Sequence, residues 1–160
     1  MNMDTLAAVG LGIIVAVLAL IVFLVTNNRT SGVTKEPRAF ATNIEEDTLN
    51  NALFRKVLYT THNLQLVLMS LAPCEEIGLE QHDALTQFIR AEAGHGVAVI
   101  NGEPYPLNDG DVVIVPPGAP HNVINLSTKE RLQLYSLYSP PQHPPDTIHR
   151  TKADDAHVHV

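Results

Sequence analysis

Short apolar runs separated by turn residues constrain the fold of this chain more than any other feature of its sequence. They occupy residues 54–61, 64–73, 76–82, 86–93, 97–100, 103–107, 111–116, 117–126 and 131–140. Asn101-Gly102 separates two of these runs and is typical of a β-hairpin, because a type I′ turn needs positive φ at both positions. No long helical period interrupts the series. Closely spaced strands with glycine and proline turns indicate a sandwich or barrel, so we predict an all-β domain over residues 44–145.

The charge balance and the cysteine content exclude two classes of function. The chain of 160 residues carries 10 Lys and Arg against 17 Asp and Glu, a formal charge of -7. A nucleic-acid groove needs a basic face, so we expect no nucleic-acid partner. Cys74 is the only cysteine, which excludes an intramolecular disulfide and a CxxC metal or redox motif.

An uncharged apolar run, Leu6 to Val25, precedes the strand-rich part of the chain. At about 1.5 Å per residue a helix of this length covers roughly 30 Å, the thickness of the bilayer core. A cleaved signal peptide is the alternative, but it would have a basic amino end and a small-residue cleavage site. We therefore predict a transmembrane helix within residues 1–26, followed by a polar juxtamembrane linker over 27–43, with a C-terminal tail over 146–160.

Basic residues follow this run and none precedes it. Arg29, Lys35 and Arg38 lie on its carboxyl side. Since basic residues favour the cytoplasmic side, we predict a single-pass membrane protein with its amino terminus outside and the remaining domain in the cytoplasm. The lipid bilayer would then be one of its partners.

Glu80 and His82 lie two residues apart in one extended run, so their side chains share a face of the strand. If that face is the core, two polar groups are buried together and need a partner. A metal ion would satisfy both. A water-facing strand is the alternative.

The stretch GDVVIVPPGAPHNVIN resembles the second motif of the cupin superfamily, G-(x)5-P-x-G-(x)2-H-(x)3-N. Every fixed position agrees, at Gly110, Pro116, Gly118, His121 and Asn125. The resemblance extends over residues 54–145. It implies a double-stranded β-helix, or jelly-roll barrel, preceded here by the transmembrane helix.

The first motif of that superfamily, G-(x)5-H-x-H-(x)3,4-E-(x)6-G, is matched in outline. His82 takes the second histidine and Gly94 the closing glycine. Glu80 stands in place of the first histidine, Gln87 in place of the glutamate, and Cys74 in place of the opening glycine. Within the superfamily the chain resembles small bacterial cupins of the mannose-6-phosphate isomerase-like group.

The resemblance implies a metal in the barrel mouth, held by Glu80, His82, Gln87 and His121. Two imidazoles, one carboxylate and one amide suit a divalent transition metal such as Zn, Mn, Fe or Ni. In the metal-free alternative, Glu80 is in water, Gln87 bonds the backbone and His121 is an ordinary turn residue. The other histidines are expected on the outside of the domain: His95 in a solvated turn at the rim, His143 and His149 in an irregular proline-rich segment, and His157 and His159 in an unstructured tail.

Two functions follow. The first is a membrane-anchored cupin that binds a divalent metal and a small polar ligand in the barrel mouth. The second is a non-catalytic accessory subunit of a larger membrane complex, docked by its single helix. No acid–base pair or nucleophile motif names a reaction, so an enzyme activity stays undecided. A homodimer through the outer strands is expected from the resemblance.

Overall fold

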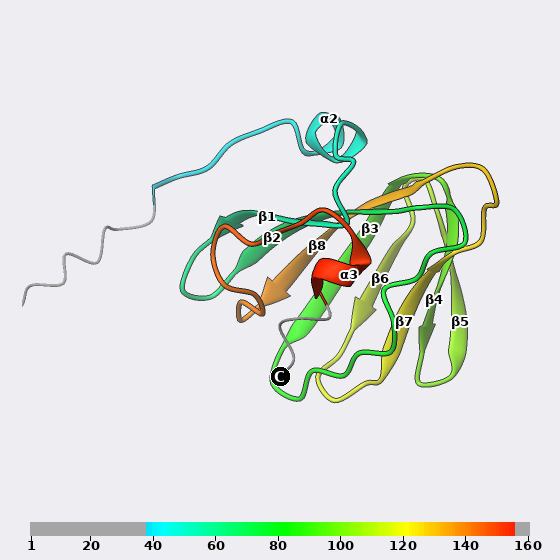
Figure 1. Cartoon of the computed structure of the whole chain (residues 1–160). Helices are drawn as coiled ribbons and strands as arrows, with labels where there is room; N and C mark the ends of the chain where they lie inside the picture. Colours follow the sequence, from blue (N-terminus) through cyan, green and yellow to red (C-terminus); the bar gives the residue numbers. More distant parts are fainter. Residues whose placement is uncertain (1–37, 156–160) are drawn as a thin grey trace, which may run out of the picture. The chain divides into compact units, whose positions relative to one another are not determined.

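A computed structural model describes residues 38–155, and these residues form two antiparallel β-sheets around one core (Figure 1). The elements in chain order are α2 (Ile44–Leu49), β1 (Arg55–Thr60), β2 (Gln65–Leu71), β3 (Thr86–Ala93), β4 (His95–Ile100), β5 (Glu103–Asn108), β6 (Val112–Val115), β7 (His121–Asn125), β8 (Leu132–Ser139), β9 (Ile148–His149) and α3 (Lys152–Asp155). The prediction of an all-β fold is confirmed.

The six-stranded sheet has the order β6-β3-β8-β2-β1-β9, and the three-stranded sheet has the order β5-β4-β7. β4, β5 and β7 lie together on one side of Figure 1, beside β6 and β3. Consecutive strands pair in β1–β2 and β4–β5, whereas β3 pairs with β8 and β4 with β7 across long stretches of sequence. This topology brings the 76–82 segment next to the start of β7, where Glu80 forms a bridge with His121.

Side chains alternate between buried and half-buried along the central strands, as a sheet with one inner face requires. β8 buries Leu132, Leu134, Ser136 and Tyr138, so its inner face changes from apolar to polar along the strand. The polar end continues on both neighbours, because Tyr138 is directly opposite Gln65 on β2 and Gln87 on β3. The inner face of the six-stranded sheet therefore carries a row of polar side chains at one end of the core.

The 76–82 run was predicted as a strand, and the structure differs there. Only Glu76 and Glu80 form isolated bridges, both to β7. Gly78 lies between them with φ +110, a conformation that interrupts an extended strand. The run therefore follows β7 as a loop, held there by the reciprocal backbone bonds of Glu80 with His121 and by bonds of Ile77 and Gly78 to β7.

The C-terminal segment also differs from its predicted form as an irregular wrap followed by a tail. β9 pairs with β1, and α3 follows it. His149 is buried at 8% exposure, because its strand closes the free edge of β1. His157 and His159 lie outside the described residues.

The predicted localisation is corrected by the helices of the structure. Within residues 38–155, α2 has 6 residues and α3 has 4, and neither is long and apolar enough to cross a bilayer. The apolar run 6–25, on which the prediction of a single-pass membrane protein with a cytoplasmic domain rested, lies outside the described residues.

The motif glycine Gly94 provides a test of this packing. It has φ +95, and a Cβ at this position would meet the carbonyl oxygen of Arg131 and lie 2.8 Å from Leu132 Cα. Replacement by alanine thus adds a backbone clash to the strain of a positive φ. We expect Gly94→Ala to lower the free energy of unfolding by about 3 kcal/mol or more, measured by urea denaturation.

Gly102 is the matched control. It has φ +83, but no atom lies within 4 Å of the place that a Cβ would take, so Gly102→Ala should cost only the strain, about 1 kcal/mol. Equal losses in the two variants would contradict the close approach at Gly94.

Candidate metal centre at the barrel mouth

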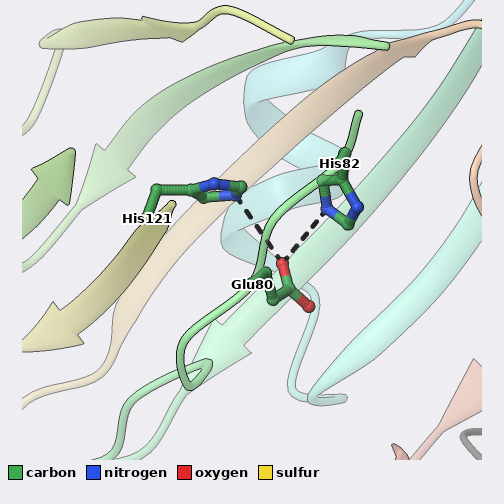
Figure 2. Close-up of side chains that lie close together, drawn as sticks. All are labelled: Glu80, His82 and His121. Atoms are coloured by element: carbon green, nitrogen blue, oxygen red, sulfur yellow. Dashed lines mark ion pairs between the residues drawn. The ribbon is translucent and has the colours of Figure 1, made fainter. Parts of the chain in front are cut away.

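The structure brings the four predicted side chains together. Glu80 and His82 come from the loop before β3, Gln87 from the polar end of β3, and His121 from the first position of β7. Glu80 Oε2 lies 3.6 Å from His82 Nε2 and 3.8 Å from His121 Nε2, as the dashed lines of Figure 2 show. Gln87 Oε1 lies 2.9 Å from the same His121 nitrogen. The ligand atoms of Glu80, His82 and His121 therefore lie within 4.8 Å of one another, and Gln87 joins them through its contact with His121.

The hydrogen-bond partners of His121 indicate which of its ring nitrogens carries a proton. Its Nδ1 lies 3.0 Å from the carbonyl oxygen of Ala119, which can only accept, so Nδ1 carries a proton. In the neutral imidazole Nε2 is then a lone pair, yet it faces Gln87 Oε1, which is also an acceptor. Two acceptors at this distance repel unless a second proton or a metal cation lies against them.

The Gln87 amide meets three polar side chains at the polar end of the core. Its Nε2 lies 3.0 Å from the Tyr138 hydroxyl and 3.4 Å from Ser136 Oγ, and the side chain is buried at 1% exposure. In this orientation Oε1 faces His121 and is free to bind a cation there; with the amide turned, the two hydroxyls would donate to Oε1 and Nε2 would donate to His121. Both orientations use side chains, in contrast to the metal-free prediction in which Gln87 bonds the backbone.

His82 Nε2 is a buried nitrogen without a hydrogen-bond partner. It faces Glu80 Oε2 from a distance too long for a hydrogen bond. Metal–ligand bonds of about 2.0–2.2 Å place two ligands of one ion roughly 3 to 4 Å apart. The separations of Glu80 Oε2 from the two imidazole nitrogens fall in that range, so Glu80, His82 and His121 fit a divalent ion.

Glu80 uses its two oxygens differently. Oε2 faces the imidazoles, while Oε1 lies 3.5 Å from Nη2 of Arg55, a guanidinium buried at 1% exposure. Burial raises the pKa of the Glu80 carboxyl, but attraction to His82 and to Arg55 outweighs burial and holds this pKa below its usual value. The carboxylate is therefore ionised at neutral pH and oriented from behind, as metal-ligating carboxylates are.

Tyr138 and His143 complete the surroundings as neutral groups. Burial raises the pKa of the Tyr138 phenol, so its hydroxyl stays protonated. Burial, followed by the charge of Arg55, lowers the pKa of His143 to about 3. A hollow of about 420 Å³ opens beside the centre, lined by Leu79, Glu80, Gln81, His82, Gln142 and His143. Its volume suits a small molecule.

Arg55, His143 and His149 lie at this end of the barrel, which the sequence did not predict for any of them. Arg55 has the same inward parity on its strand as Val57, a signal that the sequence contained. His143 and His149 were expected outside, but His143 Nε2 is buried, and Gln65 holds the backbone of that residue through both of its polar groups, at 2.9 and 2.7 Å. A partner so distant in sequence gives no local signal.

Comparisons with known proteins agree with this architecture. The Cupin domain family matches residues 67–138. The chain is 43% identical over 124 residues to the uncharacterized protein YrkC of Bacillus subtilis, covering 74% of this chain and 66% of that protein. It is 37% identical over 119 residues to the uncharacterized protein L612 of Acanthamoeba polyphaga mimivirus, covering 72% of this chain and 74% of that protein.

A solved structure agrees as well. The crystal structure of BH2720 from Bacillus halodurans is 40% identical in sequence, with a TM-score of 0.74, and the match covers 78% of this chain and 98% of that one. The motif at 110–125, the two-sheet fold and these relatives lead to one conclusion: the chain belongs to the cupin superfamily.

Proposed function

We propose that this cupin domain binds one divalent transition metal through Glu80, His82, Gln87 and His121, and presents it to a small polar ligand in the hollow beside it. The observation that carries the proposal is the convergence of Glu80, His82 and His121, whose ligand atoms all lie within 4.8 Å of one another, with Gln87 Oε1 2.9 Å from His121 Nε2. The unpartnered Nε2 of His82 supports it from the opposite side.

The donor set limits which ions are suitable. Two imidazoles favour Zn, Mn, Fe or Ni over Ca, which prefers oxygen ligands. Glu80 is the one charged ligand, because an amide stands at Gln87. A bound ion would supply Lewis-acid chemistry, polarising an oxygen of the ligand.

The residues of the chain itself would shape the ligand side of the hollow. His143, neutral at physiological pH, lines the same hollow as Glu80 and His82 and offers an uncharged imidazole there. Gln65 fixes the backbone of His143, so this wall is positioned by the six-stranded sheet. The likeness to the mannose-6-phosphate isomerase-like group, the accessory-subunit role and the homodimer stay predictions.

Metal content tests the centre. The full chain, reconstituted with Zn or Mn and dialysed, should hold about one ion by elemental analysis, while His82→Ala and His121→Ala should lose it because each removes a ligand. Gln87→Glu should retain the ion more strongly, since it adds a ligand charge.

His95→Ala is the matched control, because this imidazole is exposed on β4 and bonds Asn108 instead. Circular dichroism verifies that each variant folds. A wild-type protein without stoichiometric metal, or His82→Ala and His121→Ala variants that keep it, would refute the proposal.

The pH dependence of stability tests the buried state of His143. Its pKa of about 3 lies below the unfolded value of about 6.5, so folding favours the neutral ring. The resulting stability is complete above pH 6.5 and is lost as the pH falls from 6.5 towards 3. Between pH 7 and 5 the metal-free wild type should lose roughly 1 to 2 kcal/mol more than His143→Gln in urea denaturation.

His62→Gln, an exposed histidine between β1 and β2, should behave as the wild type does. Parallel pH profiles for wild type and His143→Gln would show that the His143 ring is solvated in the folded protein.

A further inference from the structure

Arg55 is a buried cation with unused hydrogen-bonding capacity. Its Nη1 pairs with the carboxylate of Asp155, its Nη2 faces Glu80, and its Nε has no hydrogen-bond partner. A guanidinium has five N–H donors in a planar fork that matches a carboxylate. Such a group, at 1% exposure, is placed to bind an anion.

His149 lies beside Arg55 because of the sheet register. The two residues are directly opposite each other in the β1–β9 pair, so their side chains face the same way. His149 Nδ1 lies 3.1 Å from Asp155 Oδ1, but without the direction of a hydrogen bond. The Asp155 carboxylate thus lies against a guanidinium and an imidazole that two paired strands hold in place.

The helix that carries Asp155 is weakly attached. α3 has 4 residues, none of them buried, and Asp154 caps it locally by accepting from the backbone N–H groups of Arg150 and Thr151. The ion pair of Lys152 with Glu76, at 3.7 Å, joins side chains that are 41% and 47% exposed. Such a pair contributes about 0 to 1 kcal/mol, so the contact of Asp155 with Arg55 is the stronger polar attachment.

A second hollow lies where α3 meets the 77–80 loop. It measures about 490 Å³ and is lined by Ile77, Gly78, Leu79, Glu80, Lys152, Ala153 and Asp155. Two of these residues, Glu80 and Asp155, are the carboxylates that face Arg55. Lys152 in this lining is paired with Glu76. If Asp155 moved out, Arg55 would keep Glu80 as its one carboxylate and its freed N–H groups would attract an anion.

We propose that Arg55 and His149 form a carboxylate-binding subsite, that Asp155 occupies it as a tethered carboxylate, and that a small carboxylate ligand binds by displacing Asp155 and α3. The incoming group would accept from the N–H groups that Asp155 uses, with Arg55 Nε as a further donor. Because Glu80 contacts both Arg55 and the two imidazoles, a carboxylate bound at Arg55 would lie beside the proposed metal centre. Only that last point rests on the proposed function.

A tethered group competes at an effective concentration of about millimolar, so it weakens the binding of a free carboxylate. The neutral isostere at Asp155 removes this competition. In isothermal titration of the metal-free full chain, Asp155→Asn should bind malonate about tenfold or more tightly than the wild type. Malonamide, which lacks the charge, should not bind either protein.

Asp146→Asn is the matched control, with the same charge change at an exposed position of the same segment. It should bind malonate as the wild type does. Equal malonate affinity of Asp155→Asn and wild type would overturn the proposal and leave Asp155 as a fixed structural ion pair.

NMR of the wild type keeps the proposal testable if Asp155→Asn fails to fold. Malonate should shift the Arg55 Nε–H resonance and the amide resonances of α3 together. Saturation that leaves both unmoved, or no saturation up to high millimolar malonate, would overturn the proposal. Since no metal is present, a failure here is distinct from a failure of the metal centre, which elemental analysis decides.

Discussion

The carboxylate of Glu80 is the contact on which the rest of the mouth depends. It comes from a loop, yet it is fixed on three sides, by a backbone bridge to His121, by Arg55 behind it and by two imidazoles before it. Removing the charge would leave the buried Arg55 with Asp155 alone and both imidazoles without their anionic neighbour. A single group therefore couples the loop, β1, β7 and the C-terminal segment.

The loop that carries Glu80 lies against the polar end of the core. Gln65, Tyr138 and Gln87 are level with one another across β2, β8 and β3, so the sheet register places three hydrogen-bonding side chains in one buried row. All three are hydrogen-bonded, Gln65 to the backbone of His143 and Tyr138 to Gln87, as buried polar groups usually are. Gln65 holds the chain at His143, whereas Gln87 faces His121. This row therefore supports the candidate centre through Gln87 and fixes the segment of His143, which lines the neighbouring hollow, through Gln65.

The sequence predicted those features of the fold that depend on residues close together in the chain. The Asn101-Gly102 hairpin, the strand alternation and the second motif depend on neighbours a few residues apart, and they led to the all-β cupin fold and to His121. Gly94 was identified as a motif position, but the physical reason for a glycine there, the close approach of Arg131 and Leu132, is seen only in the packing.

Arg55 was not predicted to be buried, although it has the inward parity of its strand, because a charged residue on an inner face is unusual. β9 and α3 could not be predicted, since a two-residue strand and a four-residue helix are fixed by their partners β1 and Arg55. The localisation failed for another reason: it extended a hydropathy argument about residues 6–25 to the whole protein.

Charge balance connects the candidate centre with the subsite behind it. Arg55 and Asp155 cancel, so a divalent ion beside Glu80 would leave one net positive charge, given the amide at Gln87. A carboxylate at that position of the motif would have neutralised the ion fully and removed the attraction for an anionic ligand. With the amide, the missing charge can come from the ligand, and Arg55 is the cation available to hold a further carboxylate. The carboxylate at the first histidine position and the amide at the glutamate position therefore have a physical consequence: Glu80, and not the residue on β3, is the carboxylate that contacts both Arg55 and the imidazoles.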